Sequence, residues 1–233
     1  LSIRAALAAS DPGNTGRQRD LSASYDRIGA VLAERGELDR ALEKFRASLA
    51  IAERLAARPD ATSATQRDLS TSHDRIGDIL VDRKDPTGAL QAYLASLAIR
   101  LRLVEADPTN AGWKRDLSVS YDALGDVLID SDAKGALEMY RRSLAISTTL
   151  AALDATNVGW QRDLAFGHAN VGDALVATRD PAGARTAYRA SLAIREALTK
   201  RDPANPVWQR ELAALRAKLA GLSLSQRPKL LGP

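Results

Sequence analysis

The sequence predicts an all-α protein in which two-helix units repeat and stack on their neighbours as a solenoid. The first observation is a self-repeat of 47 or 48 residues, a period typical of repeat architectures. The second is apolar spacing near 3.6 residues, and the third is a 4% aromatic content that suits closely packed helices. An Arg-Asp-Leu marker defines the period, at Arg19-Asp20-Leu21, Arg67-Asp68-Leu69, Arg115-Asp116-Leu117 and Arg162-Asp163-Leu164, with the variant Arg210-Glu211-Leu212.

The repeat divides the chain into elements in a fixed order. We expect one array over 1–221, made of a partial helix over 1–10, repeats over about 14–58, 62–106, 110–153 and 157–201, and a capping helix over about 206–221. An irregular tail is expected over 222–233 because its apolar residues show no periodicity. Since the first residues match the inside of a later helix, we expect the chain to be part of a longer protein.

Each repeat contains a first helix, called helix A, and a second, called helix B. Asparagine or threonine precedes each helix A, where its side chain can cap free amides, at Asn14, Thr62, Asn110, Asn157 and Asn205. Asp85-Pro86 and Asp180-Pro181 give the same kind of start signal for helix B. The third connection, Ser131 to Gly135, is one residue shorter than the others, and we expect the loop to absorb this deletion.

A glycine recurs inside helix A although it costs about 1 kcal/mol relative to alanine. The sequence pairs Gly29, Gly77, Gly125 and Gly172 with the helix B residues Ala41, Ala89, Ala136 and Ala184. We expect the two small residues to face each other where the helices cross closely.

Composition excludes several kinds of chemistry. The chain has no cysteine, so it has neither disulfides nor thiolate metal sites, and we expect a cytoplasmic protein. No apolar stretch approaches the roughly 20 residues that span a bilayer, so no membrane partner is expected. The two histidines, His73 and His168, fall on the core stripe of helix A where other repeats have tyrosine, which favours packing over catalysis. We therefore expect no enzyme, no catalytic residue, no cofactor and no metal.

The spacing of the repeats resembles that of a known family. The order Tyr25, Ile28, Gly29, Leu32, Ala41, Phe45, Ser48 recurs as His73, Ile76, Gly77, Leu80, Ala89, Tyr93, Ser96, and then in the third and fourth repeats. This pattern resembles the tetratricopeptide repeat, although these units are longer than the usual length of about 34 residues. The longer units resemble the kinesin-light-chain-like branch and the arrays of bacterial multidomain signalling proteins. The resemblance implies a right-handed α-solenoid whose A helices line a concave partner-binding surface, and it implies no catalysis.

Acidic residues collect on one face of helix A, opposite the core stripe. They are spaced i, i+4, i+8. Each pair of like charges four residues apart destabilises a helix by roughly a few tenths of a kcal/mol. We expect them to line a groove for a basic peptide or helix, with two apolar residues and a threonine nearer the helix starts. The groove set is Asp26, Glu34, Thr71, Asp74, Asp78, Asp82, Val119, Asp122, Asp126, Asp130, Phe166 and Asp173.

Other interpretations of this face stay open. The acidic run can be only the solvated side of the helices, relieved by neighbours such as Arg27, Arg75 and Arg83. A divalent cation held by facing carboxylates is another possibility, although no loop-type calcium motif is present. Helix B carries a basic outer set that allows self-association, or binding of an anionic surface, through Arg46, Arg54, Arg100, Arg102, Arg141, Arg142, Arg189 and Arg195. Without interleaved aromatics, we expect no nucleic-acid partner.

The sequence thus predicts a non-enzymatic protein–protein interaction module that binds a basic peptide or helix in an acidic groove. The alternative is a structural or regulatory segment of a larger bacterial signalling protein that couples domains or self-assembles.

Overall fold

The computed structural model describes residues 1–225, and these residues form ten α-helices and no strand. The helices are α1 (Ser2–Ser10), α2 (Thr15–Glu34), α3 (Leu38–Ala56), α4 (Ser63–Asp82), α5 (Pro86–Ala106), α6 (Ala111–Leu128), α7 (Ala133–Leu153), α8 (Val158–Ala177), α9 (Pro181–Arg201) and α10 (Pro206–Ser225). The all-α prediction is confirmed, and α2, α4, α6 and α8 are the A helices.

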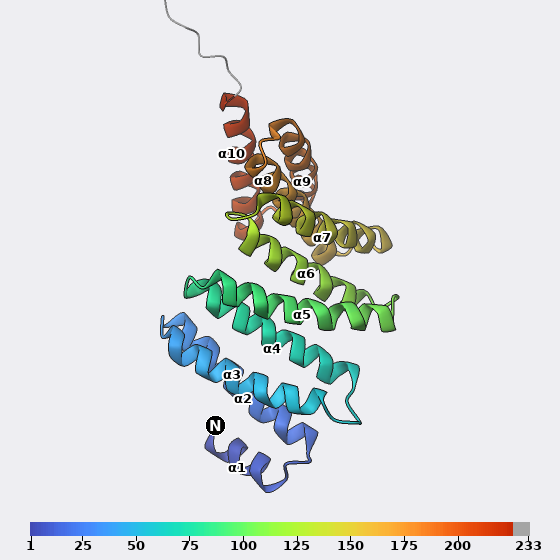
Figure 1. Ribbon diagram of the computed structural model, residues 1–233. Helices are drawn as coiled ribbons and strands as arrows, with labels where there is room; N and C mark the ends of the chain where they lie inside the picture. The colour runs from blue at the N-terminus through green and yellow to red at the C-terminus, as the bar shows by residue number, and fades with distance from the viewer. Residues whose placement is uncertain (226–233) are drawn as a thin grey trace, which may run out of the picture. The chain divides into compact units, whose positions relative to one another are not determined.

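The chain forms two compact units, residues 1–120 and residues from 121 onward, with the boundary inside α6. In the first unit α1 to α5 follow one another in chain order, and each packs against the next (Figure 1). In the second unit α7 packs on α8, α8 on α9, and α9 on α10. Packing between sequence neighbours is the arrangement of stacked helical repeats. The single continuous array remains a prediction.

The helix-start predictions are confirmed by side-chain hydrogen bonds. Asn14 Oδ1 accepts from the Arg17 amide at 3.0 Å, and the equivalent residues of the later repeats cap their A helices in the same way. Asp85 and Asp180 each accept from a glycine amide at 2.9 Å at the start of a helix B. Caps of this kind contribute about 1 kcal/mol each because they satisfy amides that the helix leaves free.

The deletion in the third repeat shortens a helix, whereas the sequence predicted a shorter loop. Helix α6 has 18 residues, while α2, α4 and α8 have 20. In the other repeats the turn after helix A contains a residue of positive φ, namely Gly36, Lys84 or Arg179. Among the described residues the third turn contains none, because α6 ends at Leu128 and the chain turns earlier.

The helix A glycines make room for an aromatic ring of helix B, and not for the alanines that the sequence predicted as their partners. A β-carbon on Gly29 would lie 2.7 Å from Phe45 Cε1, and one on Gly77 would clash with the Tyr93 ring. Tyr140 and Tyr188 occupy the same place against Gly125 and Gly172. The reason is geometric, since the ring lies flat across the crossing and a methyl group would occupy its volume.

The Arg-Asp-Leu marker forms contacts between successive repeats. Arg19 pairs with Asp68 at 2.7 Å, and Arg67 pairs with Asp116 at 2.5 Å. Arg162 pairs with Glu211 at 2.8 Å, which explains why the variant marker keeps an acid. These pairs are partly exposed, so each contributes at most about 1 kcal/mol.

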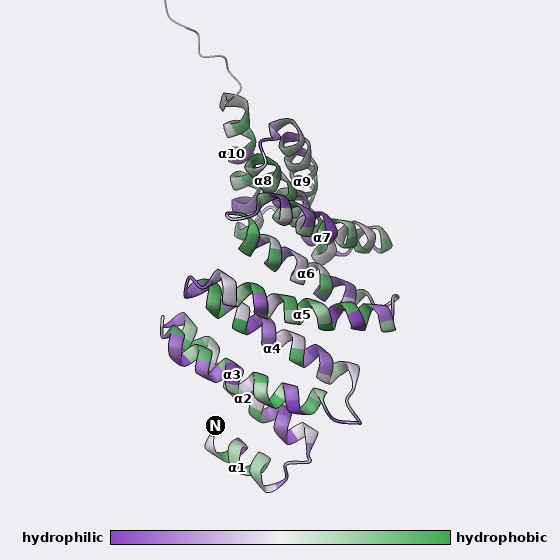
Figure 2. Ribbon diagram, in the orientation of Figure 1, coloured by the Kyte–Doolittle hydropathy of each residue, from purple (hydrophilic) through white to green (hydrophobic). Residues whose placement is uncertain are grey.

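Buried apolar residues from both helices of a repeat form the core. Ile79, Leu124 and Leu150 are at most 2% exposed, and each such side chain contributes about 1.5–3 kcal/mol through burial. Figure 2 shows apolar and hydrophilic residues alternating along the helices of each unit.

Helix α10 continues to Ser225, although the sequence predicted an irregular tail from Leu222. Leu215 is buried in the core of the second unit, and Leu219 and Leu222 pack against that core, so their helical spacing extends the helix. The rest of the predicted tail, 226–233, lies outside the described residues.

Candidate functional site

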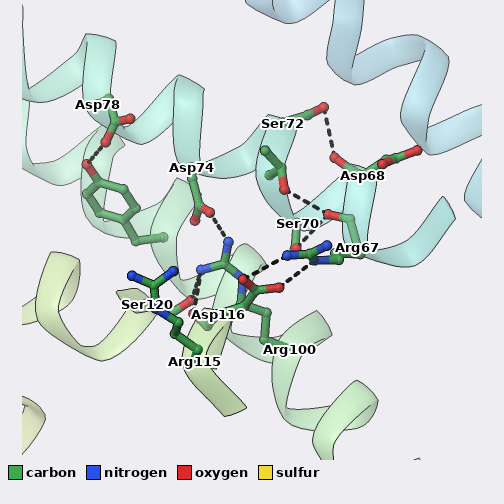
Figure 3. A network of polar contacts seen from close by, with 12 residues as sticks. Arg67, Asp68, Ser70, Ser72, Asp74, Asp78, Arg100, Arg115, Asp116 and Ser120 are labelled. Carbon is green, nitrogen blue, oxygen red and sulfur yellow. Dashed lines mark hydrogen bonds and ion pairs between the residues drawn. The ribbon is translucent and has the colours of Figure 1, made fainter. Parts of the chain in front are cut away.

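The predicted groove residues lie on the A helices, but most of their carboxylates contact other side chains of the same chain. Asp74 on α4 is ion-paired with Arg100 of α5 (Figure 3). The exposed fractions are 7% for the Arg100 side chain and 19% for that of Asp74, so the pair is largely removed from water. Burial raises the pKa of Asp74, and the Arg100 charge opposes this shift.

Arg100 also binds the start of the next A helix. Its Nη1 donates to the Asp116 carbonyl oxygen at 2.8 Å and to Ser120 Oγ at 2.7 Å (Figure 3). One guanidinium therefore joins helix A of the second repeat to helix A of the third. Two or more charge-assisted hydrogen bonds from a planar group fix both position and orientation. Arg100 was predicted to lie on the outer face of helix B, and that prediction is wrong, as is the one for Arg195, which is 6% exposed.

Asp26, the first-repeat equivalent of Asp74, has a different cation. It is ion-paired with Arg75, which comes from α4 of the following repeat. The Arg75 side chain is 38% exposed, so this cation lies nearer to solvent than Arg100 does, while the Asp26 side chain is 13% exposed. The Oδ1 atoms of Asp26 and Asp74 are buried and accept no hydrogen bond from described residues.

A second set of carboxylates accepts from tyrosine. Tyr93 Oη donates to Asp78 Oδ1 at 2.6 Å, Tyr140 to Asp126 at 2.7 Å and Tyr188 to Asp173 at 2.6 Å. Each aspartate directly follows the glycine on which the tyrosine ring lies. The first repeat has Phe45 in place of tyrosine and Ala30 in place of aspartate, so donor and acceptor are absent together. Burial raises the pKa of Asp78 and of Asp126, while the tyrosine hydroxyl lowers it.

The side chains that donate to Asp122 in the described part of the chain are neutral. Its oxygens accept from Ser143 Oγ at 2.8 Å and from Asn170 Nδ2 at 3.3 Å. Burial raises the pKa of Asp122 to about 6, against the lowering effect of these two hydrogen bonds. The charge of Asp122 therefore changes at a higher pH than that of an ordinary aspartate.

At the C-terminal end the chain supplies its own cations. Lys218 of α10 contacts both oxygens of Asp173 at 2.7 Å, and Arg216 pairs with Glu196 at 2.8 Å. A lysine already contacts the one acid that the fourth repeat places on this face.

The remaining predicted residues differ in exposure. Glu34 and Asp82 are exposed at the ends of their helices, and Val119 is 51% exposed. Asp130 was predicted to lie on helix A, but it follows the end of α6 because that helix is short. The hydroxyl of Thr71 donates to the Arg67 carbonyl oxygen at 3.0 Å.

Phe166, predicted as an apolar anchor, is 39% exposed. The Arg195 and Arg162 guanidinium carbons lie 4.6 and 5.7 Å from its ring centre, so two cations of the same unit already cover its face.

The sequence prediction treated these carboxylates as free, and for most of them the structure shows otherwise. Helix B of the same repeat approaches this face from one side, and helix A of the next repeat approaches from the other. Their Tyr, Arg, Ser and Asn side chains reach the acids before a partner would. The exposed acids that remain on this face are fewer than the predicted set.

The first unit has an open cleft that the sequence prediction did not identify. It encloses about 470 Å³ between α2, α3 and α4, within the usual volume of a small-ligand site. Ala52 and Leu55 of α3 line it. The polar lining comes from the A helices α2 and α4, through Arg19, Asp20, Ser22, Asp26, Asp68, Thr71, Ser72 and Arg75. The sequence contained one signal for this cleft: Ala52 is a small residue at the position where the next repeat has Arg100.

Residues 1–225 contain no cluster of three or more His, Cys, Asp or Glu side chains that could hold a metal ion. In the same part of the chain, no helix has both the length and the apolar character that a membrane span requires. His73 and His168 are half-buried, and burial lowers the pKa of both.

Helix pairs that pack on their sequence neighbours and begin at side-chain caps define a helical-repeat protein. A family model described as tetratricopeptide repeat matches residues 21–58 of the chain. This match supports the predicted tetratricopeptide repeat family, while the kinesin-light-chain-like subtype remains a prediction. A search of curated proteins by sequence found no match.

Solved structures show the same fold. BtubC (BKLC) from P. vanneervenii aligns with a TM-score of 0.62 and 19% identity, over 80% of this chain and 66% of BtubC. The apo form of RapI aligns with a TM-score of 0.64 and 15% identity, over 94% of this chain and 54% of RapI. The yeast histone chaperone Hif1 aligns with a TM-score of 0.57 and 12% identity, over 91% of this chain and 99% of Hif1. The chain therefore spans about two thirds or less of the first two proteins.

Proposed function

We propose that this chain is a non-enzymatic protein-interaction module that binds a partner segment bearing basic side chains on the A-helix surface of residues 1–120. The observation that carries this proposal is the 470 Å³ cleft, in which three carboxylates, those of Asp20, Asp26 and Asp68, accompany two guanidiniums. An excess of acid in a recess attracts a cationic partner and raises its rate of association.

The family supports an interaction role. Tetratricopeptide repeats act as protein-binding scaffolds, and one structural neighbour, Hif1, is described as a scaffold protein recruiting protein complexes to core histones. The cytoplasmic location remains a prediction.

The structure changes how the proposal should be tested. Reversing the charge of Asp74 or Asp122 would break buried contacts, so loss of binding could result from loss of folding. Asp20, Glu34 and Asp82 are exposed, and their replacement by lysine changes charge without removing a buried partner. Glu105→Lys on α5 is a matched control, because it makes the same charge change at an exposed site away from the cleft.

The experiment is fluorescence anisotropy with a panel of labelled peptides of about 15 residues, a length that spans several helical turns. The panel contains arginine-rich, lysine-rich, neutral and acidic sequences of matched length. We expect the basic peptides to bind, and the Asp20→Lys variant to bind them about tenfold more weakly, while Glu105→Lys binds as the wild type does. Equal binding by all variants, or no preference for basic peptides, would contradict the proposal.

Self-association is the second candidate, and the basic outer faces of helices B favour it. Arg46, Arg54 and Arg102 are exposed in the first unit. Sedimentation velocity at several salt concentrations separates the candidates, because a monomer under all conditions excludes assembly driven by opposite charges.

A further inference from the structure

One position of the repeat alternates between arginine and a small residue. It lies on the helix that precedes each helix A, and its occupants in chain order are Arg4, Ala52, Arg100, Ser147 and Arg195. Each of the three arginines bonds to the helix A that follows it, and the partners lie at the same offsets. Arg4 and Arg100 both contact the carbonyl oxygen 16 residues later and the serine hydroxyl 20 residues later. Arg195 contacts the side chain 16 residues later, that of Glu211, at 2.8 Å.

These acceptors form a binding site for a guanidinium group, which we call the socket. In the junction between the second and third repeats, the socket consists of the Asp74 carboxylate, the Asp116 carbonyl oxygen and Ser120 Oγ. Arg100 fills it and is 5% exposed as a whole residue. The chain thus shows directly which group these acceptors bind.

The junction between the first and second repeats has the same socket without its arginine. The equivalent residues are Asp26, Asp68 and Ser72, and all three line the cleft beside Ala52. Ser72 is 3% exposed and its hydroxyl donates to the Asp68 carbonyl oxygen at 3.1 Å. In the filled socket of Arg4, Ser24 donates to Asp20 in the same way while its oxygen accepts from the guanidinium. By the same geometry, the Ser72 oxygen can accept a hydrogen bond from a donor in the cleft that it lines.

The other small residue at this position, Ser147, does not leave a comparable space. The residue equivalent to Ser72 and Ser120 is Gly167, and a β-carbon there would lie 3.3 Å from Leu144 Cα and 3.2 Å from its Cδ1. Helices α7 and α8 approach so closely here that a serine side chain would be in tight contact with Leu144. Where Ser147 replaces the arginine, the helices pack more closely. Where Ala52 replaces it, a cleft stays open.

We propose that the cleft beside Ala52 binds an arginine side chain of a partner protein, which takes the place that Arg100 occupies one repeat later. This proposal rests on the function proposed above and specifies the chemistry of its partner. Arg19 and Arg75 also line the cleft, and each is already paired, with Asp68 and Asp26 respectively. The exposed carboxylate of Asp20 leaves the lining with one net negative charge, which favours a cationic guest.

Arginine fits this socket better than lysine does. The acceptors are a carboxylate, a backbone carbonyl and a hydroxyl, which lie on two different A helices. A planar guanidinium offers five N–H donors in fixed directions and satisfies such separated acceptors together. A lysine ammonium is more strongly hydrated and acts as a point charge, so it gains less from the same site.

The test uses a small probe and one substitution. N-acetylarginine amide and N-acetyllysine amide are titrated into the ¹⁵N-labelled chain, and amide chemical shifts are followed. We expect the arginine probe to shift the amides of Asp26, Asp68 and Ser72, and the lysine probe to bind at least about fivefold more weakly. Ala52→Arg should fill the socket from within, as Arg100 does, and weaken binding of the arginine probe at least about tenfold.

Two variants control for folding and for charge. Ala50→Arg adds the same side chain to the exposed face of the same helix, and it should bind the probe as the wild type does. Ser72→Ala removes one acceptor without altering charge, so a few-fold weaker affinity for the arginine probe would support the socket even if Ala52→Arg failed to fold.

The outcomes separate this proposal from the broader one. If basic peptides bind the wild type and Ala52→Arg equally well, the socket is wrong and the interaction role stands. If the arginine probe shifts the cleft amides but no basic peptide binds, the socket stands and the peptide-binding role fails. Equal binding of the arginine and lysine probes, or unchanged binding after Ala52→Arg, would overturn the arginine proposal.

Discussion

The two repeat junctions within residues 1–120 neutralise a helix A aspartate with arginines from different helices. Each places an aspartate on helix A, Asp26 in the first junction and Asp74 in the second. Asp74 is neutralised by Arg100, whose side chain is 7% exposed, whereas Asp26 is neutralised by Arg75, which is 38% exposed and comes from the next helix A. The comparison teaches that one arginine, placed on helix B or on helix A, decides whether a junction is filled or open.

The largest expected effect is the loss of Arg100. Arg100→Ala removes a buried cation and leaves Asp74, the Asp116 carbonyl and Ser120 without that donor. Breaking a buried ion pair from one side costs several kcal/mol, so we expect the free energy of unfolding to fall by about 3 kcal/mol. Urea denaturation measures this change, and the variant should also gain a second cleft like the one beside Ala52.

Arg75→Ala breaks the corresponding pair of the first junction. Because Arg75 is more exposed, we expect a loss of only about 1 kcal/mol. Arg102→Ala, at an exposed site of α5, should change stability by less than about 0.5 kcal/mol. Equal losses for Arg100→Ala and Arg75→Ala would mean that the two junctions are energetically alike.

A smaller effect is expected at Asp122, whose donors Ser143 and Asn170 are neutral. Folding raises the pKa of Asp122 from 3.8 to about 6 through burial, so the native state binds this proton more tightly than the unfolded state. The stabilisation from the protonated group is complete below the unfolded pKa and is lost as the pH rises through the folded one. We expect this group alone to lower the free energy of unfolding by about 2 kcal/mol between about pH 4 and pH 7.

Asp122→Asn should remove that contribution, because its amide oxygen still accepts from Ser143 but carries no charge at any pH. The measurement is urea denaturation of both proteins across this pH range. Asp130→Asn, at an exposed position, is the matched control and should keep the wild-type pH dependence. Parallel profiles for Asp122→Asn and the wild type would show that the carboxyl titrates normally.

The smallest effect compares the aromatic pairs of the first two repeats. Tyr93→Phe together with Asp78→Ala recreates the Phe45 and Ala30 pair of the first repeat. Each single change removes the hydrogen bond between Tyr93 and Asp78 and should cost about 1 kcal/mol. The double variant should cost less than the sum by about 0.5–1 kcal/mol, as measured by a double-mutant cycle in urea. Strict additivity would mean that the hydroxyl and the carboxylate are not coupled, and Asp82→Ala serves as the exposed control.

The features that the sequence predicted well are local ones. Asn14 caps an amide three residues away and Asp85 does the same, so residue type and position suffice to identify the cap. The helical class follows from the same short-range periodicity. The repeat period also predicted which helices pack on each other, because a unit that cannot bury its own core must use its neighbour.

The features that the sequence did not predict depend on distant partners. Asp78 accepts from a tyrosine 15 residues later, Asp74 pairs 26 residues away and Asp26 pairs 49 residues away. A helical wheel shows only that these acids share a face, and it cannot show what approaches that face. Comparison among the repeats contained a usable signal, since aspartate accompanies tyrosine and alanine accompanies phenylalanine.

The chain has a second, longer sequence period, defined by the alternation at Arg4, Ala52, Arg100, Ser147 and Arg195. Arginine returns after 96 and then 95 residues, which is two helix pairs and not one. Inserting or removing a single helix pair would therefore bring two arginine-bearing junctions, or two junctions with a small residue at this position, next to each other. Chimeras and shortened versions should exchange four helices at a time, so that every interface keeps its native neighbour.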